Sequence, residues 1–174
     1  FSVRQSYLQF LFDVIGLPFL PTFNDYQFKS KTKFNKKNEL TIVSLGALDR
    51  FKLNKDANEE PFQRYILNNI PVQNQWSYTI GGVYKHFMEK SFQTYVLSRN
   101  MLDNESYKYQ NNDESSEDNL LLRYNSQEIE NKFRFENTYR NNSNKFNFGV
   151  NLENAKYNNS TFNRFANPNS PGGV

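Results

Sequence analysis

Apolar and polar residues alternate strictly along residues 126–154, SQEIENKFRFENTYRNNSNKFNFGVNLEN. One side of this stretch carries mainly bulky apolar residues, namely Ile129, Phe133, Phe135 and Tyr139, with Asn131 and Asn137 among them. The other side carries charges almost without interruption, namely Glu128, Glu130, Lys132, Arg134, Glu136 and Arg140. A period of two residues predicts a β-strand with one apolar and one polar face.

After a polar break at residues 141–144, the alternation resumes. Phe146, Phe148, Val150 and Leu152 then alternate with Asn147, Gly149, Asn151 and Glu153. The whole stretch therefore predicts a long β-hairpin. Its charged face must meet water, because burying these charges in a core would be costly. Its apolar face needs a helix layer, a second sheet or lipid.

Two earlier stretches repeat this pattern. Residues 25–49 form a predicted hairpin around a turn at 35–38, with apolar and hydroxyl residues on one face (Tyr26, Phe28, Ser30, Thr32, Phe34) and Gln27, Lys29, Lys31 and Lys33 on the other. Residues 76–101 form another around Met88-Glu89-Lys90, with Trp76, Tyr78, Ile80, Gly82 and Tyr84 on one face.

The remaining segments predict connections. Residues 1–11 begin as an alternating strand, and Leu8, Leu11, Phe12 and Ile15 then have helical spacing. Gly16, Pro18 and Pro21 would stop a helix within about two turns, so we expect a strand that runs into an apolar connection. Residues 50–74 and 103–119 are long and polar, and residues 157–174 are rich in asparagine, which predicts three loops.

The three short turns begin near Asn35, Met88 and Asn141, at a constant spacing of 53 residues. The repeated unit is therefore strand, short turn, strand, long loop. A soluble sandwich has no reason to place all short turns at one edge, whereas a transmembrane β-barrel does. A tilted strand of about 9 to 11 residues crosses the hydrocarbon. Aromatic residues beside the turns, Phe34, Phe87, Phe92, Tyr139 and Phe146, would form an interfacial girdle.

Composition agrees with strands and restricts the chemistry. The 174 residues include 17 Phe and 11 Tyr but no Cys, which removes disulfides and thiolate sites. No apolar run reaches the roughly 18 residues of a transmembrane helix. The 21 basic and 18 acidic residues are interspersed and give a net charge of only +3, unlike a nucleic-acid footprint.

Six stretches resemble the barrel of TonB-dependent outer-membrane receptors of the Bacteroidetes type. They are SVRQSYLQFLFDVIGLPFLPTFNDYQFK, KNELTIVSLGALDRFKLN, NNIPVQNQWSYTIGGVYKH, YVLSRN, LLLRYNSQEIENKFRFENTYR and FNFGVNLENAKYNNSTFN. The resemblance implies an all-β, antiparallel up-and-down meander within a plugged barrel of about 22 strands. It also implies uptake of a scarce nutrient (siderophore, glycan or peptide) across the outer membrane, without enzymatic activity or a cofactor.

The chain departs from this family pattern because it predicts only about seven strands and contains no plug domain or recognisable TonB box. Bacterial barrels usually have an even number of strands. We therefore expect residues 1–174 to be a fragment of a receptor barrel. Its expected partners are outer-membrane lipid, its own plug domain and remaining strands, and TonB with the inner-membrane energising complex. A surface lipoprotein is a further candidate partner, and nucleic acid is not expected.

Candidate ligand-binding residues in the predicted extracellular loops are Arg50, Arg64, Tyr65, Tyr107 and Tyr109. Their rings and fixed cations suit a sugar, peptide or siderophore, although loop packing explains them more simply. The charges expected to face the lumen are Lys29, Lys31, Lys33, Glu128, Glu130, Lys132, Arg134 and Glu136. A solvated wall with internal ion pairs explains these residues more simply than ligand guidance.

Two other functions compete with transport. A soluble single-stranded nucleic-acid platform would place lysines and aromatic rings on one face, whereas here they alternate onto opposite faces. A barrel hydrolase would depend on His86, the only histidine, which has no acid or nucleophile at a recognisable spacing. The acidic run Asp113, Glu114, Glu117 and Asp118 lacks the spacing of a calcium loop, so we expect no metal site.

Overall fold

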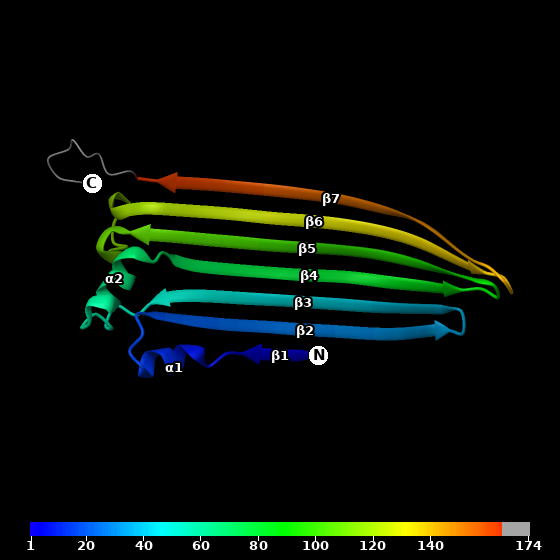
Figure 1. Ribbon diagram of the computed structural model, residues 1–174, viewed down its shortest axis with the longest axis horizontal. Coiled ribbons are helices and arrows are strands. Elements are labelled where there is room, and N and C mark those ends of the chain that lie inside the picture. Colours follow the sequence, from blue (N-terminus) through cyan, green and yellow to red (C-terminus); the bar gives the residue numbers. More distant parts are fainter. Residues whose placement is uncertain (165–174) are drawn as a thin grey trace.

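Seven antiparallel strands form one open sheet in the order of the chain (Figure 1). The computed structural model describes residues 1–164. The strands are β1 (Ser2–Gln5), β2 (Phe19–Asn35), β3 (Asn38–Leu53), β4 (Val72–Phe87), β5 (Ser91–Tyr109), β6 (Leu120–Arg140) and β7 (Lys145–Asn163). The prediction of an all-β up-and-down meander is confirmed.

The three predicted short turns lie at one end of the sheet, and the longer connections lie at the other (Figure 1). Each successive turn also projects beyond the one before it. The Phe87 N–H donates to the Lys37 carbonyl at 2.7 Å, which places the end of β4 beside the first turn. The Arg140 N–H likewise donates to the Lys90 carbonyl at 2.7 Å, beside the second turn. The turns therefore form a staggered edge.

Strand pairing extends the predicted alternation across the whole sheet. Ser30, Ile42, Gly82, Leu97, Phe133 and Leu152 form one cross-strand row, and their side of the sheet is called the apolar face. The next row towards the turns on the opposite side is Lys31, Thr41, Val83, Val96, Arg134 and Asn151, and this side is called the polar face. The face assignment of all three predicted hairpins is confirmed.

No second layer covers the apolar face within residues 1–164. Leu97 is 65% exposed in the middle of the sheet, and Phe148 and Leu152 are 62% and 60% exposed on β7. Few apolar side chains of the described part are buried, and Leu67, Val72 and Leu120 among them lie near the long connections. The stability of the sheet alone therefore rests mainly on its hydrogen-bonded ladders and cross-strand side-chain pairs.

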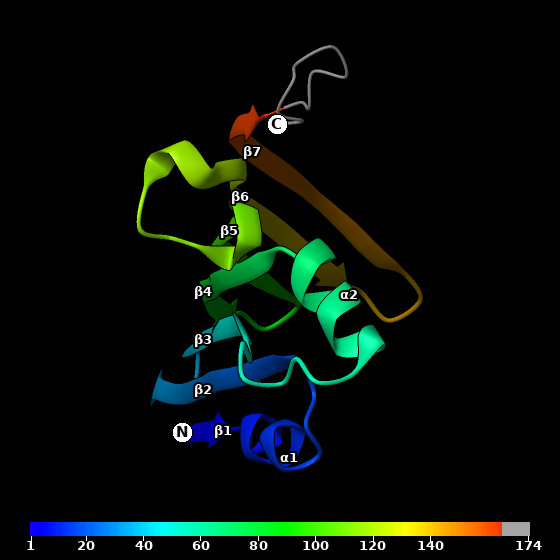
Figure 2. The same cartoon turned by 90° about the vertical axis from the view of Figure 1, so that its left-hand side faces the viewer.

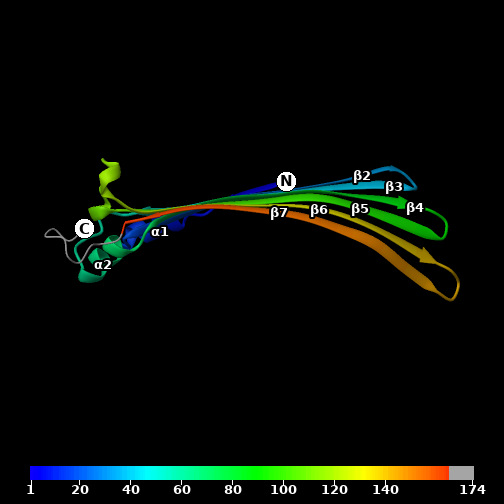
Figure 3. The ribbon, with the colours of Figure 1, turned by 90° about the horizontal axis from the view of Figure 1, so that it is seen from above.

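Two short helices lie near the long connections, α1 (Leu8–Val14) and α2 (Pro61–Asn69). Both lie on one side of the sheet, and the segment with η1 (Gln110–Asn112) and η2 (Glu117–Asn119) lies on the other (Figure 2). Within residues 1–164, neither helix is long and apolar enough to cross a membrane. Towards the turns, β6 and β7 bend to the side that carries α1 and α2 (Figure 3).

The structure corrects the expectation for residues 8–14, which form α1 and not an apolar connection. The helix ends at Val14, and Gly16 just after it has a positive φ of 68°, which suits a residue without a side chain. The Leu17 N–H donates back to the Phe12 carbonyl at 2.9 Å, and the Phe12 and Phe19 rings meet edge to face. The helix is therefore as short as the glycine and prolines predict, but it does form.

The strands are also longer than predicted, because ladder pairing continues through polar segments. β3 includes residues 50–53, β5 includes residues 103–109, and β7 includes residues 157–163, all of which were predicted as loop. The predicted loop at 157–174 is therefore wrong for residues 157–163, and residues 165–174 lie outside the described part. Phe87 and Phe92 pair with each other on the polar face, so they do not join Phe34, Tyr139 and Phe146 in a girdle.

Candidate functional site

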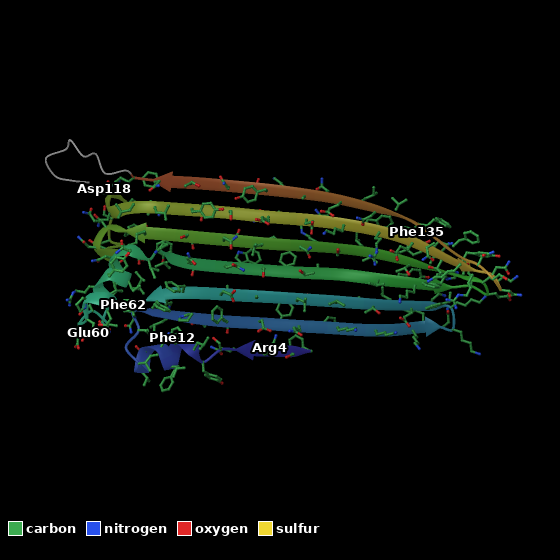
Figure 4. All side chains as sticks on the ribbon, viewed as in Figure 1. Arg4, Phe12, Glu60, Phe62, Asp118 and Phe135 are labelled. Atoms are coloured by element: carbon green, nitrogen blue, oxygen red, sulfur yellow. The ribbon has the colours of Figure 1, made fainter. Side chains whose placement is uncertain are left out.

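The apolar face carries a band of exposed apolar side chains next to the turns. It includes Phe28, Phe34, Ile42, Ile80, Leu97, Phe133, Tyr139, Phe146, Phe148, Val150 and Leu152. Phe135, close to the turn end of β6, lies within it (Figure 4). Tyr26, Trp76 and Tyr78 lie at its opposite margin on β2 and β4. The band covers only the turn-side part of the strands, since the rows nearer the loops are polar.

This band crosses the hydrogen-bonded rows obliquely between β4 and β7. Ile80 is in the middle of the apolar run of β4, yet its row continues through Arg99 and Asn131 to Asn154. The apolar run of β7 ends one row nearer the turns, at Leu152. Since the turns shift in the same direction, the band follows the staggered edge. If the strands cross the band at an oblique angle, both the band and the turns shift along the rows from one strand to the next in this way.

The polar face carries ion pairs, two of which join neighbouring strands and two of which lie within β6. Lys31 Nζ lies 2.8 Å from Glu39 Oε1, and Lys132 Nζ lies 2.9 Å from Glu130 Oε2 and 3.5 Å from Glu153 Oε2. Arg134 Nε lies 3.5 Å from Glu136 Oε1. The lumen-facing set predicted from the sequence thus lies on one face. Lys29, Lys33 and Glu128 form no ion pair within residues 1–164.

A depression of about 670 Å³ lies on the loop-side part of the polar face. Two adjacent rows form its floor, with Phe23, Asp49, Gln75 and Asn104 in one and Phe51, Gln73, Ser106 and Tyr124 in the other. Aromatic rings therefore flank a strip of carboxylate, amide and hydroxyl groups. Such a strip offers stacking surfaces together with hydrogen-bond donors and acceptors.

Asp49, Gln73 and Gln75 leave their polar groups free to meet a ligand. None of their side chains makes a hydrogen bond within residues 1–164. Burial, with a smaller contribution from the charge of Asp25, raises the pKa of the Asp49 carboxyl. Arg50, the one cation among the lining residues, belongs by strand alternation to the apolar face. The polar floor therefore carries a carboxylate and amides without a facing cation.

The structure disperses the five ligand-binding residues predicted from the sequence. Arg50, Tyr107 and Tyr109 are strand residues of β3 and β5, so their assignment to loops is wrong. Arg64 and Tyr65 are on α2, where the Arg64 guanidinium donates to the Asn58 carbonyl at 3.0 Å and Tyr65 is 65% exposed. Arg64 thus braces its own connection, and only Tyr107 and Tyr109 come together.

Tyr107 and Tyr109 form a cluster with two residues that the sequence did not single out as partners. Their ring centroids lie 5.9 Å apart, edge to face. Arg123 Nη2 donates to Tyr109 Oη at 3.0 Å and to Glu117 Oε1 at 2.8 Å. The bond from Arg123 lowers the pKa of the Glu117 carboxyl. Arg123 has no local sequence signal, because only pairing of β5 with β6 brings it beside Tyr107.

Lys108 fastens α2 to the sheet from the polar face. Its ammonium donates to the carbonyls of Leu67 and Ile70 and, at 2.6 Å, to Asn112 Oδ1. These carbonyls lie at the C-terminal end of α2, where a cation is favourable. Burial lowers the pKa of Lys108, and the charge of Lys55 adds to this effect. Lys55 Nζ itself donates to the Asn112 carbonyl at 2.6 Å, so the two long connections form one unit.

His86 contacts a residue of the neighbouring strand β3. Its Nδ1 lies 2.7 Å from Asn38 Oδ1, which also accepts a bond from Tyr84 Oη at 2.6 Å. No nucleophile or carboxylate bonds to His86 within residues 1–164. No cluster of three or more metal-ligating side chains occurs in this part of the chain. Asp113 instead accepts bonds from the Ser115 N–H and the Asn119 amide.

No family model matches the chain, and neither the curated proteins nor the solved structures contain a significant match.

Proposed function

We propose that residues 1–174 form part of the barrel wall of a TonB-dependent outer-membrane receptor that takes up a scarce nutrient. In this proposal the apolar face lies against lipid, and the polar face lines a plugged, water-filled lumen. Further strands, from a barrel of about 22, would pair with the open edges of β1 and β7. The short turns would face the periplasm and the long connections would face outside.

The observation that carries the proposal is the oblique band of exposed apolar side chains. Its position beside the turns, with a charged and ion-paired face behind it, has the alternation of a membrane barrel strand. Strands in such barrels are inclined by about 35 to 45°, so a band parallel to the membrane must cross the hydrogen-bonded rows. A soluble partner surface would not require the band and the turn edge to shift together.

The length of the strands fits the same arrangement. About 9 to 11 residues cross the hydrocarbon, whereas β5, β6 and β7 have 19, 21 and 19 residues. The excess lies on the loop side, where the sheet would project outwards. The depression at Asp49 would then lie on the lumen wall near the outer mouth, which makes it the candidate ligand contact.

Fractionation of cells that produce the full-length protein tests the location. We expect it in the outer membrane after carbonate washing and extractable only with detergent. Externally added protease should cleave within residues 54–71 or 110–119 in whole cells, and at the short turns only after permeabilisation. Recovery in the soluble fraction would refute the membrane proposal, and cleavage of the short turns from outside would refute the orientation.

Growth on single nutrient sources tests transport. A strain that lacks this gene and a strain that lacks TonB should share a growth defect on at least one carbon, iron or peptide source. Plasmid-borne wild-type protein should restore growth only where TonB is present. Restored growth in the absence of TonB would contradict energised uptake through this receptor.

A further inference from the structure

The staggered edge formed by the three short turns is strongly basic. Its cations are Lys36, Lys37, Lys90, Arg140 and Lys145, and Glu89 is the carboxylate among residues 35–37, 88–90 and 140–145. All five cations are exposed, and none forms an ion pair within residues 1–164. The nearby carboxylate of Glu39 is already paired with Lys31 at 2.8 Å.

The opposite end of the sheet has the reverse charge. Residues 54–71 and 110–119 carry the carboxylates Asp56, Glu59, Glu60, Asp113, Glu114, Glu117 and Asp118, against the cations Lys55 and Arg64. Glu60 and Asp118 lie at this end in Figure 4. The positive charge therefore belongs to the turn edge specifically and does not reflect the average composition of the chain.

Two of the basic residues are the sequence neighbours of the last aromatic residues of the apolar face. Arg140 follows Tyr139, and Lys145 precedes Phe146, so each of these two cations is one strand residue, about 3.4 Å, beyond the apolar band. Backbone hydrogen bonds between successive turns keep the cations along one continuous line. If the band lies in hydrocarbon, this line lies at the depth of the lipid headgroups.

On the basis of the proposed function, we propose that the turn edge binds anionic phospholipid headgroups of the leaflet that it faces. Ammonium and guanidinium groups pair with headgroup phosphates, while the acyl chains cover the adjacent apolar band. A Lys or Arg near an anionic membrane surface favours the bound state by about fivefold. A line of five such groups therefore gives substantial selectivity over zwitterionic lipid.

An acidic protein segment is the competing partner. A groove of about 500 Å³ lies between the second and third turns, with Lys90, Arg140 and Lys145 around Phe87 and Phe92. This groove involves only three of the five cations, because Lys36 and Lys37 are on the first turn. A bilayer surface extends along the whole edge and accounts for all five, which favours the lipid.

The test uses the full-length protein in vesicles of equal parts phosphatidylglycerol and phosphatidylcholine. After mild detergent extraction, native mass spectrometry counts the two lipids that remain bound. The turn-edge variant is Lys37→Gln/Lys90→Gln/Lys145→Gln. The matched control is Lys29→Gln/Lys33→Gln/Lys85→Gln, which removes the same charge from lysines that form no ion pair and lie on the polar face, away from the proposed lipid contact.

Wild type and control should retain phosphatidylglycerol in preference to phosphatidylcholine. In the turn-edge variant this preference should be lower by a factor of at least about ten, because three of the five cations have been removed. Equal preference in all three proteins, with normal insertion, would overturn the lipid site and leave the proposed function intact. Failure of the wild-type protein to enter the vesicles would refute the proposed function itself.

Discussion

The substitution Leu97→Arg places a charge in the middle of the proposed lipid-facing band. Leu97 is 65% exposed on β5, with apolar Phe133 as a cross-strand neighbour, so a larger side chain meets little steric resistance from the described residues. An arginine at the midplane on the lipid face of a barrel costs about 2 to 4 kcal/mol, and near the interface about 0 to 1 kcal/mol. We therefore expect Leu97→Arg to lower the free energy of unfolding from the membrane by about 3 kcal/mol.

Two matched variants separate lipid contact from a general effect of charge. Tyr139→Arg lies on the same face beside the third turn and should cost about 1 kcal/mol or less. Thr79→Arg lies on the polar face of β4, in a cross-strand row that includes Asn100 and Glu130. It should change stability by no more than about 0.5 kcal/mol.

The assay is reversible guanidinium unfolding of the full-length protein from lipid vesicles, followed by the mobility shift of unheated samples in gels. The loss of unfolding free energy should be smallest for Thr79→Arg, larger for Tyr139→Arg and largest for Leu97→Arg. Equal losses for Tyr139→Arg and Leu97→Arg would remove the depth dependence that a bilayer imposes. A loss for Thr79→Arg as large as that for Leu97→Arg would refute the assignment of the two faces.

Three further outcomes test the loop-side part of the sheet. Lys108→Met should lower the free energy of opening α2 by about 2 kcal/mol, because it removes three charged hydrogen bonds and relieves one buried charge; unchanged hydrogen exchange over residues 61–71 would contradict this. Since the pKa of Glu117 is lowered in the folded state, its bond to Arg123 stabilises the segment above the ordinary value of 4.5 and is lost as pH falls through the lowered value. The anisotropy of a fluorescent label in residues 110–119 should fall over that acidic range, and an identical profile in Arg123→Gln would contradict the assignment. Gly149→Ala should cost about 1 to 3 kcal/mol in guanidinium unfolding, because its methyl group would overlap the Phe135 carbonyl oxygen; wild-type stability would show that β6 and β7 are spaced more widely.

The turns and both faces of the sheet could be predicted from the sequence, because side-chain alternation is a local property. Phe34 and Tyr139 fall in phase with the apolar positions before them, and the pairing of Tyr139 with Ser91 and Phe146 places it on the apolar face. The same parity would have assigned Phe87 and Phe92 to the polar face, where they pair. Their prediction as girdle residues was wrong because it used only their closeness to the turn and not the alternation that sets the face of each residue.

The ends of the strands could not be predicted from composition. Residues 103–109 are polar on both faces, so they resemble a loop, yet pairing with β4 and β6 keeps them extended. The helix at residues 8–14 depended on the positive φ of Gly16 and on the contact between Phe12 and Phe19, which require the folded chain.

The candidate ligand contact required the strand register. Phe23, Asp49, Gln75 and Asn104 come from four strands and share no sequence motif, but they form one row of the polar face. Arg123 likewise reaches Tyr109 only through the pairing of β5 with β6. The sequence could suggest which residue types suit a ligand, whereas their grouping depended on three-dimensional neighbours.

The central claim is tested most directly by spin labels placed at residues 94 to 99 of the full-length protein. The measurement is the accessibility of each label to oxygen and to a water-soluble nickel chelate. The described chain has no cysteine, so each label requires a single substitution in this segment. We predict a period of two, with high oxygen and low nickel accessibility at residues 95 and 97 and lower oxygen accessibility at 94, 96 and 98. Equal nickel accessibility at all positions, or low accessibility to both reagents at 95 and 97, would show that this face does not meet lipid.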